Sequence, residues 1–247
     1  MVRWTLGLVA AVLLSAPVAA QDKDNSKTVV EKAITATGGE GALKKYPAGV
    51  SQMKGKMILG GADVPFTGSM VFSVPGKVRM ELNAEIAGQK VSLVQVVDGE
   101  KVKQTENGKV VENITPAAKT ELLQAALLQE ISLLYPLLDA TKYTLKEGKG
   151  TILTNAVVVE SKDMKLKPVT LYFDKGTGLL SKMTRDGLSP VGVKVSEETV
   201  YEDYKDASGI KVAMKSQVMH EGKLFLDIVV TEYKPLDKTD EKFDTGS

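Results

Sequence analysis

The stretch "YEDYKDASGIKVAMKSQVMHEGKLFLDIVVTEYK", residues 201–234, decides the fold. It contains two long runs in which apolar and polar residues alternate, and the turn signals "DASG" and "HEGK" bound the first of them. Alternation with a period of two predicts strands that have one apolar and one polar face. Two such strands form one apolar wall of an antiparallel sheet, and that wall must enclose either a hollow or a packed interior.

The same pattern recurs along the chain from residue 50 onward. The clearest case is the run at 77–86, "KVRMELNAEI", in which every second residue is apolar. With the pair above, this makes about ten strands, joined mostly by hairpins, which excludes a βαβ design. No strict repeat and no low-complexity linker divides them, so residues 21–247 are expected to form one domain. The other strands are expected at 51–59, 64–74, 89–98, 151–161, 167–174, 179–186 and 193–204.

A long apolar helix interrupts the strands. In "TPAAKTELLQAALLQEISLLYPLL", residues 115–138, Thr115 is placed to cap the helix and Pro116 to occupy its first position. We expect the helix to run from Thr115 to Leu134 and to end or kink at Pro136. A helix of this character must lie against the sheet or over a cavity. At the helical spacing its apolar face consists of Leu122, Leu123, Ala126, Leu127, Leu133 and Leu134.

The first residues predict export. Arg3 precedes an uncharged apolar run, and "APVAAQD" then places small residues before a cleavage site. This is typical of a Sec-type signal peptide, residues 1–20, cleaved after Ala20. The apolar run is too short for a membrane span, although a retained N-terminal anchor is the alternative. A helix should follow, capped by Ser26 and ended by Gly38.

Composition excludes several classes of function. The chain has no cysteine, which excludes disulfides, a thiol nucleophile and Cys-based metal sites. An exported protein without disulfides fits a bacterial periplasm. Removal of Arg3 with the signal peptide leaves 31 of the 32 basic residues against 31 acidic ones, and this balance argues against nucleic-acid binding. The run "DKGTG" lacks the glycine spacing and the following helix of a phosphate loop, so no cofactor is expected.

The reactive side chains are too isolated to predict catalysis. His220 is the only histidine and lies beside the predicted turn "MHEGK". A lone histidine lacks the partners of a catalytic triad or a zinc site, so we expect it to be an exposed turn residue. The paired carboxylates Glu197 and Glu198 are expected on a solvated strand. Because no nucleophile, base and orienting group come together, the chain is predicted not to be an enzyme.

Glu130 is a carboxylate in unusual surroundings. An unpaired carboxylate on an apolar helix face would be costly to desolvate. It is therefore expected to bind a basic side chain or a turn amide of the sheet, or else to anchor the head group of a ligand at a cavity mouth. Its neighbours three and four positions away on the helix are all apolar: Ala126, Leu127, Leu133 and Leu134.

The order of elements carries a family resemblance. A helix ending in "GG" is followed by a "MKGKM" strand, hairpins, the apolar helix and further hairpins, among them "YFDKGTGLLSKM". The tail is a strand, an Asp–x–x–Gly turn with an apolar residue after it, two strands and a final Phe–Asp. Both features resemble the lipoprotein-carrier superfamily typified by LolA and LolB. The matching positions of the tail are Tyr204, Asp206, Gly209, Ile210, Ile228, Tyr233, Phe243 and Asp244.

The resemblance implies an α+β fold that is mainly antiparallel β. The expected architecture is an incomplete (half) β-barrel with the N-terminal and mid-chain helices packed on its concave face. Its cavity would hold the acyl chains of a lipoprotein or another apolar ligand. The chain departs from the group in lacking the N-terminal cysteine of a LolB-type receptor and in being only 5% aromatic, whereas carrier cavities are rich in aromatics. The fold is therefore expected to carry over better than the cargo.

The expected function is that of a periplasmic, non-enzymatic carrier or binding protein for lipoproteins or other acyl-chain ligands. The alternative is an envelope sensor or protein-interaction module that uses the same fold with a filled core. The implied partners are a lipidated protein or lipid, an inner-membrane transporter or outer-membrane acceptor, and the membrane surface through peripheral contact. The residues expected to line the cavity are Met70, Phe72, Met80, Leu82, Leu93, Leu123, Leu127, Glu130 and Leu134.

Overall fold

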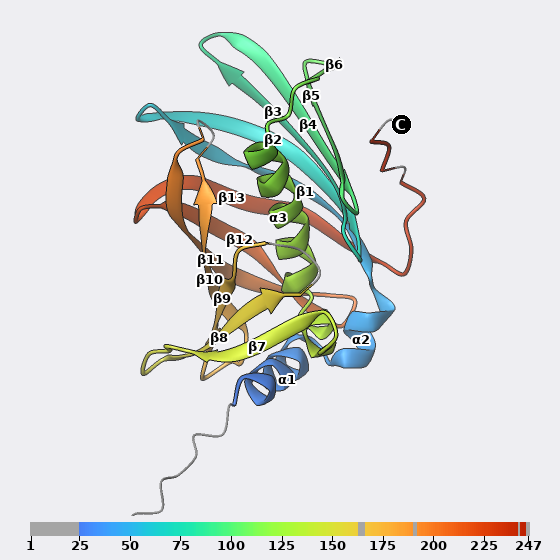
Figure 1. Ribbon diagram of the computed structural model, residues 1–247, viewed down its shortest axis with the longest axis vertical. Helices are drawn as coiled ribbons and strands as arrows, with labels where there is room; N and C mark the ends of the chain where they lie inside the picture. Colours follow the sequence, from blue (N-terminus) through green and yellow to red (C-terminus); the bar gives the residue numbers. More distant parts are fainter. Residues whose placement is uncertain (1–24, 163–165, 190–191, 242, 246–247) are drawn as a thin grey trace, which may run out of the picture.

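The computed structural model describes residues 25–162, 166–189, 192–241 and 243–245. The predicted signal peptide and its cleavage site lie outside these residues. Within them, no helix is both long and apolar enough to cross a membrane. Figure 1 shows a strongly curved sheet with helices at one end and a further helix across its concave side.

In the described residues, thirteen antiparallel strands form one sheet, in the order β6-β5-β4-β3-β2-β1-β13-β12-β11-β10-β9-β8-β7. Because β6 and β7 are its two edges, the sheet does not close, and the predicted open half-barrel is confirmed. The strands are β1 (Ala48–Leu59), β2 (Ala62–Ser73), β3 (Lys77–Ile86), β4 (Gln89–Asp98), β5 (Lys101–Glu106), β6 (Lys109–Val110), β7 (Tyr143–Gly148), β8 (Thr154–Ser161), β9 (Val169–Asp174), β10 (Leu180–Leu188), β11 (Lys194–Ala207), β12 (Ile210–His220) and β13 (Lys223–Leu236).

The stretch at 201–234 lies in the middle of the sheet, where it forms the end of β11, all of β12 and most of β13. Neighbouring strands are consecutive in the chain with one exception: β13 pairs with β1, from Ala48 opposite Leu236 to Met57 opposite Leu226. This pairing joins the first and last strands and makes one trough of the two halves of the sheet.

The turn between β11 and β12 also positions the N-terminal helix. Asp206 Oδ1 accepts a hydrogen bond from the Gly209 N–H at 3.1 Å, which closes the Asp–x–x–Gly turn. The carbonyl oxygen of Gly209 lies so close to Gly38 that a Cβ there would collide with it. Gly38 also has a φ of 137°, a conformation that other residues rarely adopt. Glycine is therefore required at the end of this helix.

The sequence predicts about ten strands, whereas the residues described in the structure form thirteen. The additional strands are β5, β6 and β7. β5 ("KVKQTE") is mostly polar and β6 has two residues, so neither shows an apolar face. β7 ("YTLKEG") has two apolar residues before its polar end. These strands are held by pairing with longer neighbours and not by their own apolar pattern.

The part of the chain that the structure describes also contains three α-helices and one 3₁₀ helix: α1 (Ser26–Thr37), α2 (Glu40–Lys45), α3 (Pro116–Ser132) and η1 (Tyr135–Leu138). The predicted start of α3 is confirmed, because Thr115 Oγ1 accepts a hydrogen bond from the Ala118 N–H at 3.2 Å. Its end lies earlier than predicted: the chain leaves α3 after Ser132, and Leu134 has a φ of 62°. The prediction for α1 was wrong by one position, since Asn25 is the N-cap and Ser26 is a buried first residue.

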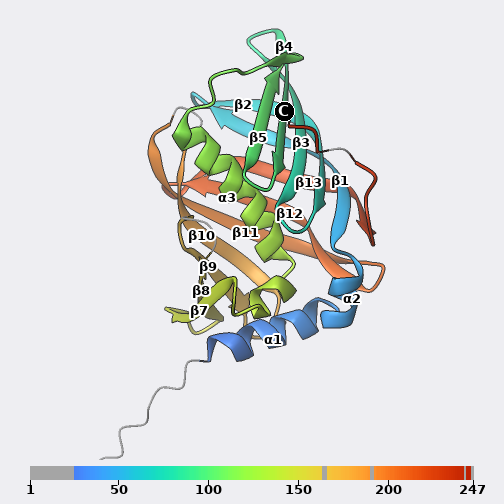
Figure 2. The same cartoon turned by 45° about the vertical axis from the view of Figure 1, so that its right-hand side comes forward.

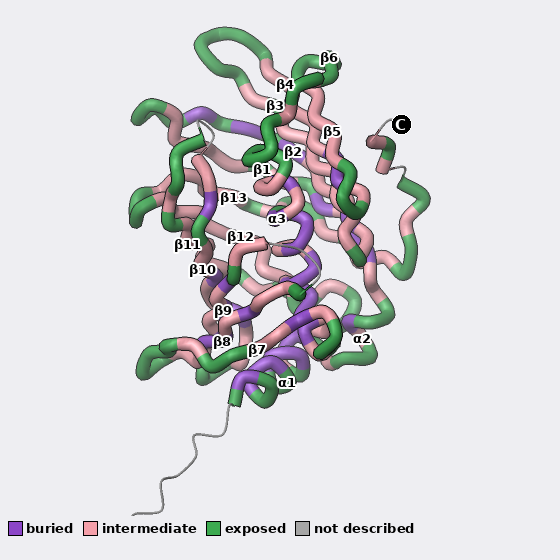
Figure 3. The backbone as a smooth tube through the Cα atoms, in the orientation of Figure 1, coloured by how far each residue is buried: buried purple, intermediate pink, exposed green. Residues whose placement is uncertain are grey.

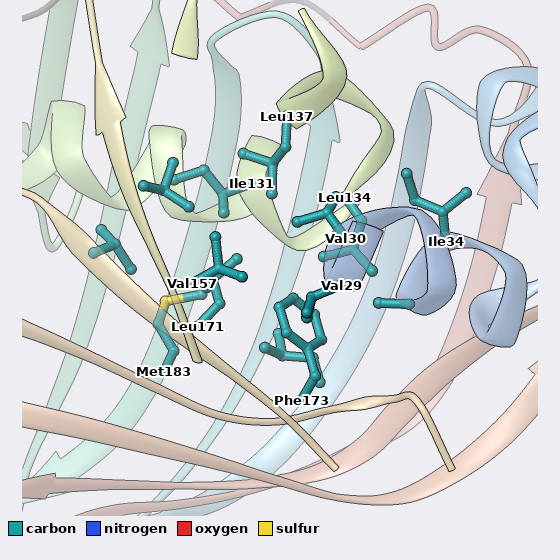
Figure 4. Packing of buried hydrophobic residues seen from close by; sticks show 14 of the residues in the cluster. Val29, Val30, Ile34, Ile131, Leu134, Leu137, Val157, Leu171, Phe173 and Met183 are labelled. Atoms are coloured by element: carbon teal, nitrogen blue, oxygen red, sulfur yellow. The ribbon is translucent and has the colours of Figure 1, made fainter. Parts of the chain in front are cut away.

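The main core lies at one end of the trough. There α1, the C-terminal part of α3 and η1 pack on β7–β10, and buried segments gather in this region of Figure 3. Figure 4 shows Val30 of α1, Leu134 and Phe173 of β9 among the side chains that point toward one another. Each fully buried side chain of this kind contributes about 1.5–3 kcal/mol. This core fixes the helices at one end, and α3 extends from it across the concave side of the sheet (Figure 2).

Candidate ligand cavity

A cavity of about 310 Å³ lies between the middle of the sheet and the end of α3. Its volume is at the lower end of the ~300–1,000 Å³ that is usual for small-molecule sites. The central strands form its floor, and residues from the ends of the three helices cover it. The residues that line it are Thr37, Leu43, Ser51, Met53, Met70, Met80, Gln129, Ser132, Leu133, Leu134, Leu180, Tyr201, Tyr204, Ile210, Lys211, Val212, Ala213, Ser216, Ile228, Val230 and Tyr233.

Strand register explains why the floor side chains converge. β1 pairs with β2 on one side and with β13 on the other, so Ser51 lies directly opposite both Met70 and Tyr233. Met70 in turn lies opposite Met80 of β3. Residues directly opposite on antiparallel strands share a face of the sheet. These four side chains therefore form one row across the floor of the cavity.

The polar groups of the roof are largely used within the helices. Ser132 Oγ, in the last turn of α3, donates a hydrogen bond to the Gln129 carbonyl oxygen at 2.7 Å. Thr37 Oγ1, at the end of α1, donates to the Ala33 carbonyl oxygen at 2.8 Å. The remaining roof residues are mainly leucines. The roof therefore presents an apolar surface to the cavity.

The lining carries little charge. Among the described residues that line the cavity, Lys211 is the only one with a formal charge at neutral pH, and it is exposed. Burial raises the pKa of Tyr233 to about 12 and also raises the pKa of Tyr201 and Tyr204. The Tyr204 hydroxyl donates a hydrogen bond to the Leu180 carbonyl oxygen at 2.7 Å. The three phenols are therefore neutral, and the arrangement suits an uncharged, mainly apolar ligand.

Of the residues predicted to line the cavity, Met70, Met80 and Leu134 do so. Leu82 and Leu93 share the concave face of the sheet and lie directly opposite each other on β3 and β4, but beyond the cavity. The trough is therefore longer than the cavity, which occupies only the part beneath the end of α3.

Phe72, Leu123 and Leu127 lie in packed regions instead. Phe72 is 1% exposed, and its ring lies over Gly49, where a Cβ would be 2.7 Å from Cε1. Leu127 belongs to the main core. Leu123 packs against a smaller cluster between α3 and β4, which contains Val97. The sequence pattern identified the apolar face of α3. It did not distinguish the turns that pack in a core from the end of the helix, which lies at the cavity.

Tyr201, Ile228 and Tyr233 form much of the floor but were not among the residues predicted to line the cavity. All three lie in the stretch that decides the fold, and the alternation there indicates which residues share a face. Their approach to Ser51 and Met70 depends on the pairing of β13 with β1, for which no local signal exists.

Glu130 makes two hydrogen bonds within the protein. It is 7% exposed; Oε1 accepts from the Tyr143 hydroxyl at 2.8 Å, and Oε2 accepts from the Gly76 N–H at 3.2 Å. Gly76 lies in the turn between the interior strands β2 and β3, whereas Tyr143 begins β7, an edge strand of the sheet. Of the expected roles, these bonds correspond to binding a turn amide of the sheet. Glu130 is not among the residues that line the cavity.

A cluster of charged side chains lies beneath the N-terminal half of α3. Arg185 of β10 donates to Glu197 through Nε at 2.8 Å and Nη2 at 3.1 Å, and to Glu121 of α3 through Nη1 at 2.7 Å. His220 Nε2 lies 3.3 Å from Glu197 Oε2, and the ring of His220 stacks on Phe225 with centroids 4.2 Å apart. This network connects α3 to β10, β11 and β12.

Two expectations from the sequence were therefore wrong. The side chain of His220 is 14% exposed, so it is not an exposed turn residue, and the side chain of Glu197 is only 13% exposed and forms an ion pair with Arg185. A bulge between Val218 and Met219 turns this end of β12, and the ring of Phe225 covers the imidazole. Across the described ranges of the chain, no group of three or more His, Asp or Glu side chains is arranged to hold a metal ion.

A larger depression, of about 520 Å³, lies at the far ends of β2, β3 and β4. Several of the side chains that line it are exposed, including Asn83, Glu85 and Lys90. Because it lies open at the surface, it encloses a ligand less completely than the 310 Å³ cavity. The cavity beneath α3 is therefore the better candidate for the functional site.

No family model matches the chain, and no curated protein matches it in sequence. Solved structures do match it. A DUF1329 family protein from Desulfovibrio piger is 10% identical, with a TM-score of 0.55 over 86% of this chain and 94% of that one. A LolA superfamily protein from Nitrosomonas europaea is 9% identical, with a TM-score of 0.56 over 87% and 95%.

A candidate outer membrane lipoprotein-sorting protein domain from Vibrio parahaemolyticus is also similar. It is 9% identical, with a TM-score of 0.52 over 88% of this chain and 95% of that one. At such identities the likeness concerns the fold and not the ligand. The resemblance inferred from the order of elements is thus confirmed at the level of architecture. The chain has the open half-barrel fold of LolA-superfamily proteins.

Proposed function

We propose that this protein is a carrier or binding protein that holds an acyl chain in the cavity beneath α3. The observation that supports this most directly is a cavity of about 310 Å³ with a mainly apolar, nearly uncharged lining. Burial of a ligand there would supply about 25 cal/mol per Å² of apolar surface, before the costs of association. The proposed role requires no chemical step.

The proposal extends to the location and the partners of the protein. With a signal peptide cleaved after Ala20, the mature chain would act in the periplasm. One of the structures that share the fold is a candidate outer membrane lipoprotein-sorting domain. We therefore propose a lipidated protein or lipid as the natural ligand. An inner-membrane transporter or outer-membrane acceptor would exchange it, with peripheral contact to the membrane.

A binding assay with a fluorescent fatty acyl probe tests the proposal. Delipidated protein should bind the probe, and Met80→Glu should weaken binding roughly tenfold or more, because it places a carboxylate where the chain would lie. Met80 is half-buried, so the glutamate can be accommodated with the sheet folded. The matched control is Gln52→Glu, which adds the same charge on the exposed opposite face of β1.

Two results would contradict the proposal. If the unmutated, delipidated protein binds no acyl probe, the carrier role is excluded and the sensor or interaction module is left. Equal loss of binding in Met80→Glu and Gln52→Glu would also contradict a site in the cavity. Native mass spectrometry of protein from an envelope extract should show a co-purifying lipid.

A further inference from the structure

One polar group in the cavity floor has no partner. Ser51 is 4% exposed and lines the cavity. Its Oγ is buried and has no hydrogen-bond partner among the residues that the structure describes. Asp227 Oδ1 is also buried and unpartnered, but Asp227 does not line the cavity. Native proteins leave few buried hydroxyls unpaired, because desolvation without a hydrogen bond is unfavourable.

Ser51 occupies a central position in the site. It stands between Met70 and Tyr233 in the row of side chains that crosses the floor. The next residue on the same face of β1 is Gly49, where a Cβ would lie only 2.9 Å from the Tyr233 hydroxyl. The absence of a side chain at Gly49 therefore leaves space for that hydroxyl on the Ser51 side of the floor. The middle of the cavity presents two neutral hydroxyls beside the thioether of Met70.

The surroundings of Ser51 determine which ligand group it can bind. Other polar lining groups, such as the hydroxyls of Ser132, Thr37 and Tyr204, already donate hydrogen bonds to backbone carbonyls. Lys211, the only charged residue of the described lining, is exposed and lies on β12, two strands away from β1. A carboxylate at Ser51 would be buried without a paired cation, which is costly. A neutral acceptor would have no such cost.

We infer that Ser51 donates a hydrogen bond to the carbonyl oxygen of an acyl ester, so that the ligand is an uncharged acyl derivative and not a free fatty acid. The methionines beside Ser51 would then pack against the part of the chain next to the carbonyl. This inference rests on the proposed function and specifies the ligand class of the same cavity. An ester of this kind occurs both in lipids and in lipidated proteins.

The test compares two probes that share one fluorophore: cis-parinaric acid and its methyl ester, at about pH 8, where the acid is ionised. The unmutated protein should bind the ester more tightly. Ser51→Ala should weaken ester binding about three- to tenfold, the value of one neutral hydrogen bond. The matched control Ser181→Ala makes the same substitution on β10, at a residue that does not line the cavity. It should change ester affinity less than about twofold, because the Ser181 O–H is donated to the Tyr172 carbonyl oxygen at 3.0 Å and lies outside the site.

A second measurement uses the protein without ligand. Because Ser51→Ala removes a buried, unpaired hydroxyl, its melting temperature should stay the same or rise. Displacement of the ester probe by a diacylglycerol or by a diacylated lipopeptide distinguishes the two sources of the ester.

Three results would overturn the inference while leaving acyl binding intact. These are unchanged ester affinity in Ser51→Ala, tighter binding of the acid than of the ester by the unmutated protein, or a lowered melting temperature of ligand-free Ser51→Ala. If the unmutated protein binds neither probe, the proposed function itself is wrong and the inference fails with it. The outcomes for the ligand class and for the carrier role are therefore separable.

Discussion

Glu130→Gln distinguishes a carboxylate that stabilises the fold from one that binds a ligand. The side chain lies on α3 and accepts hydrogen bonds from the Tyr143 hydroxyl at 2.8 Å and from the Gly76 N–H at 3.2 Å. Glutamine has nearly the same shape. It can keep both contacts only as neutral hydrogen bonds, with its amide donating to the tyrosine oxygen and its carbonyl accepting from the turn.

The expected loss follows from the change in bond type. A hydrogen bond to a charged group contributes about 1.5–3 kcal/mol, against about 0.5–1.5 kcal/mol for a neutral one. Two bonds are weakened, but the neutral side chain is also less costly to bury in this 7% exposed position. We expect the free energy of unfolding to fall by about 1–2 kcal/mol. For a domain of this size that corresponds to a melting temperature lower by about 2–8 °C.

Thermal unfolding and probe binding should be measured on the same samples. The matched control is Glu160→Gln: Glu160 forms an exposed ion pair with Lys146 at 2.7 Å, and its loss should cost no more than about 1 kcal/mol. Probe affinity should be unchanged in both variants. If Glu130→Gln instead changes probe affinity while its melting temperature stays the same, the carboxylate binds a ligand head group and our interpretation of its contacts is refuted.

Three further predictions concern the charges, the tyrosines and the N-terminus. Arg185→Ala should lower the free energy of unfolding by up to about 3–5 kcal/mol in urea titrations, because it leaves the partly buried carboxylates of Glu121 and Glu197 without their cation; a loss below about 1 kcal/mol would contradict this. The raised pKa values of the cavity tyrosines predict that stability is complete below about pH 10 and falls as the pH rises toward the folded pKa of Tyr233, about 12. Melting curves should show this, with a smaller fall in Tyr233→Phe. Mature protein should begin at Gln21 in the periplasmic fraction, whereas an intact N-terminus on washed membranes would exclude cleavage.

Much of the fold could be predicted because its signals are local. The alternation at 77–86 and 210–220 depends only on neighbouring residues, as does the helix start at Thr115 and Pro116. The turn at 206–209 is likewise closed by a side chain within the turn itself. The strands β5, β6 and β7 escaped prediction because their pairing partners hold them in place. A polar segment such as "KVKQTE" becomes a strand when a longer neighbour offers it a free edge.

The site was harder to predict because its floor depends on long-range register. The Thr231 hydroxyl donates to the Gln52 carbonyl oxygen across 179 positions of the chain, and this pairing brings Tyr233 opposite Ser51. Alternation indicates that each strand has a dry face, but it does not say which residues of two distant strands lie opposite each other. Met70 and Met80 could be expected to lie side by side on one face because they belong to a hairpin, whose register is set locally.

The mid-chain helix shows why an apolar stripe alone does not define a cavity. Its early turn packs through Leu122 on the small cluster with β4, its middle turn places Leu127 in the main core, and Leu134 after its last turn covers the cavity. The sequence contains one continuous apolar face, because leucine suits all three surroundings equally well. A charged side chain at Leu127 would therefore be buried in the main core without solvation. We expect it to unfold the protein and not to block a ligand in the cavity. Substitutions can change ligand binding without disrupting the core only in the floor of the cavity or just after the last turn of α3. Met80 and Ser51 both lie in the floor.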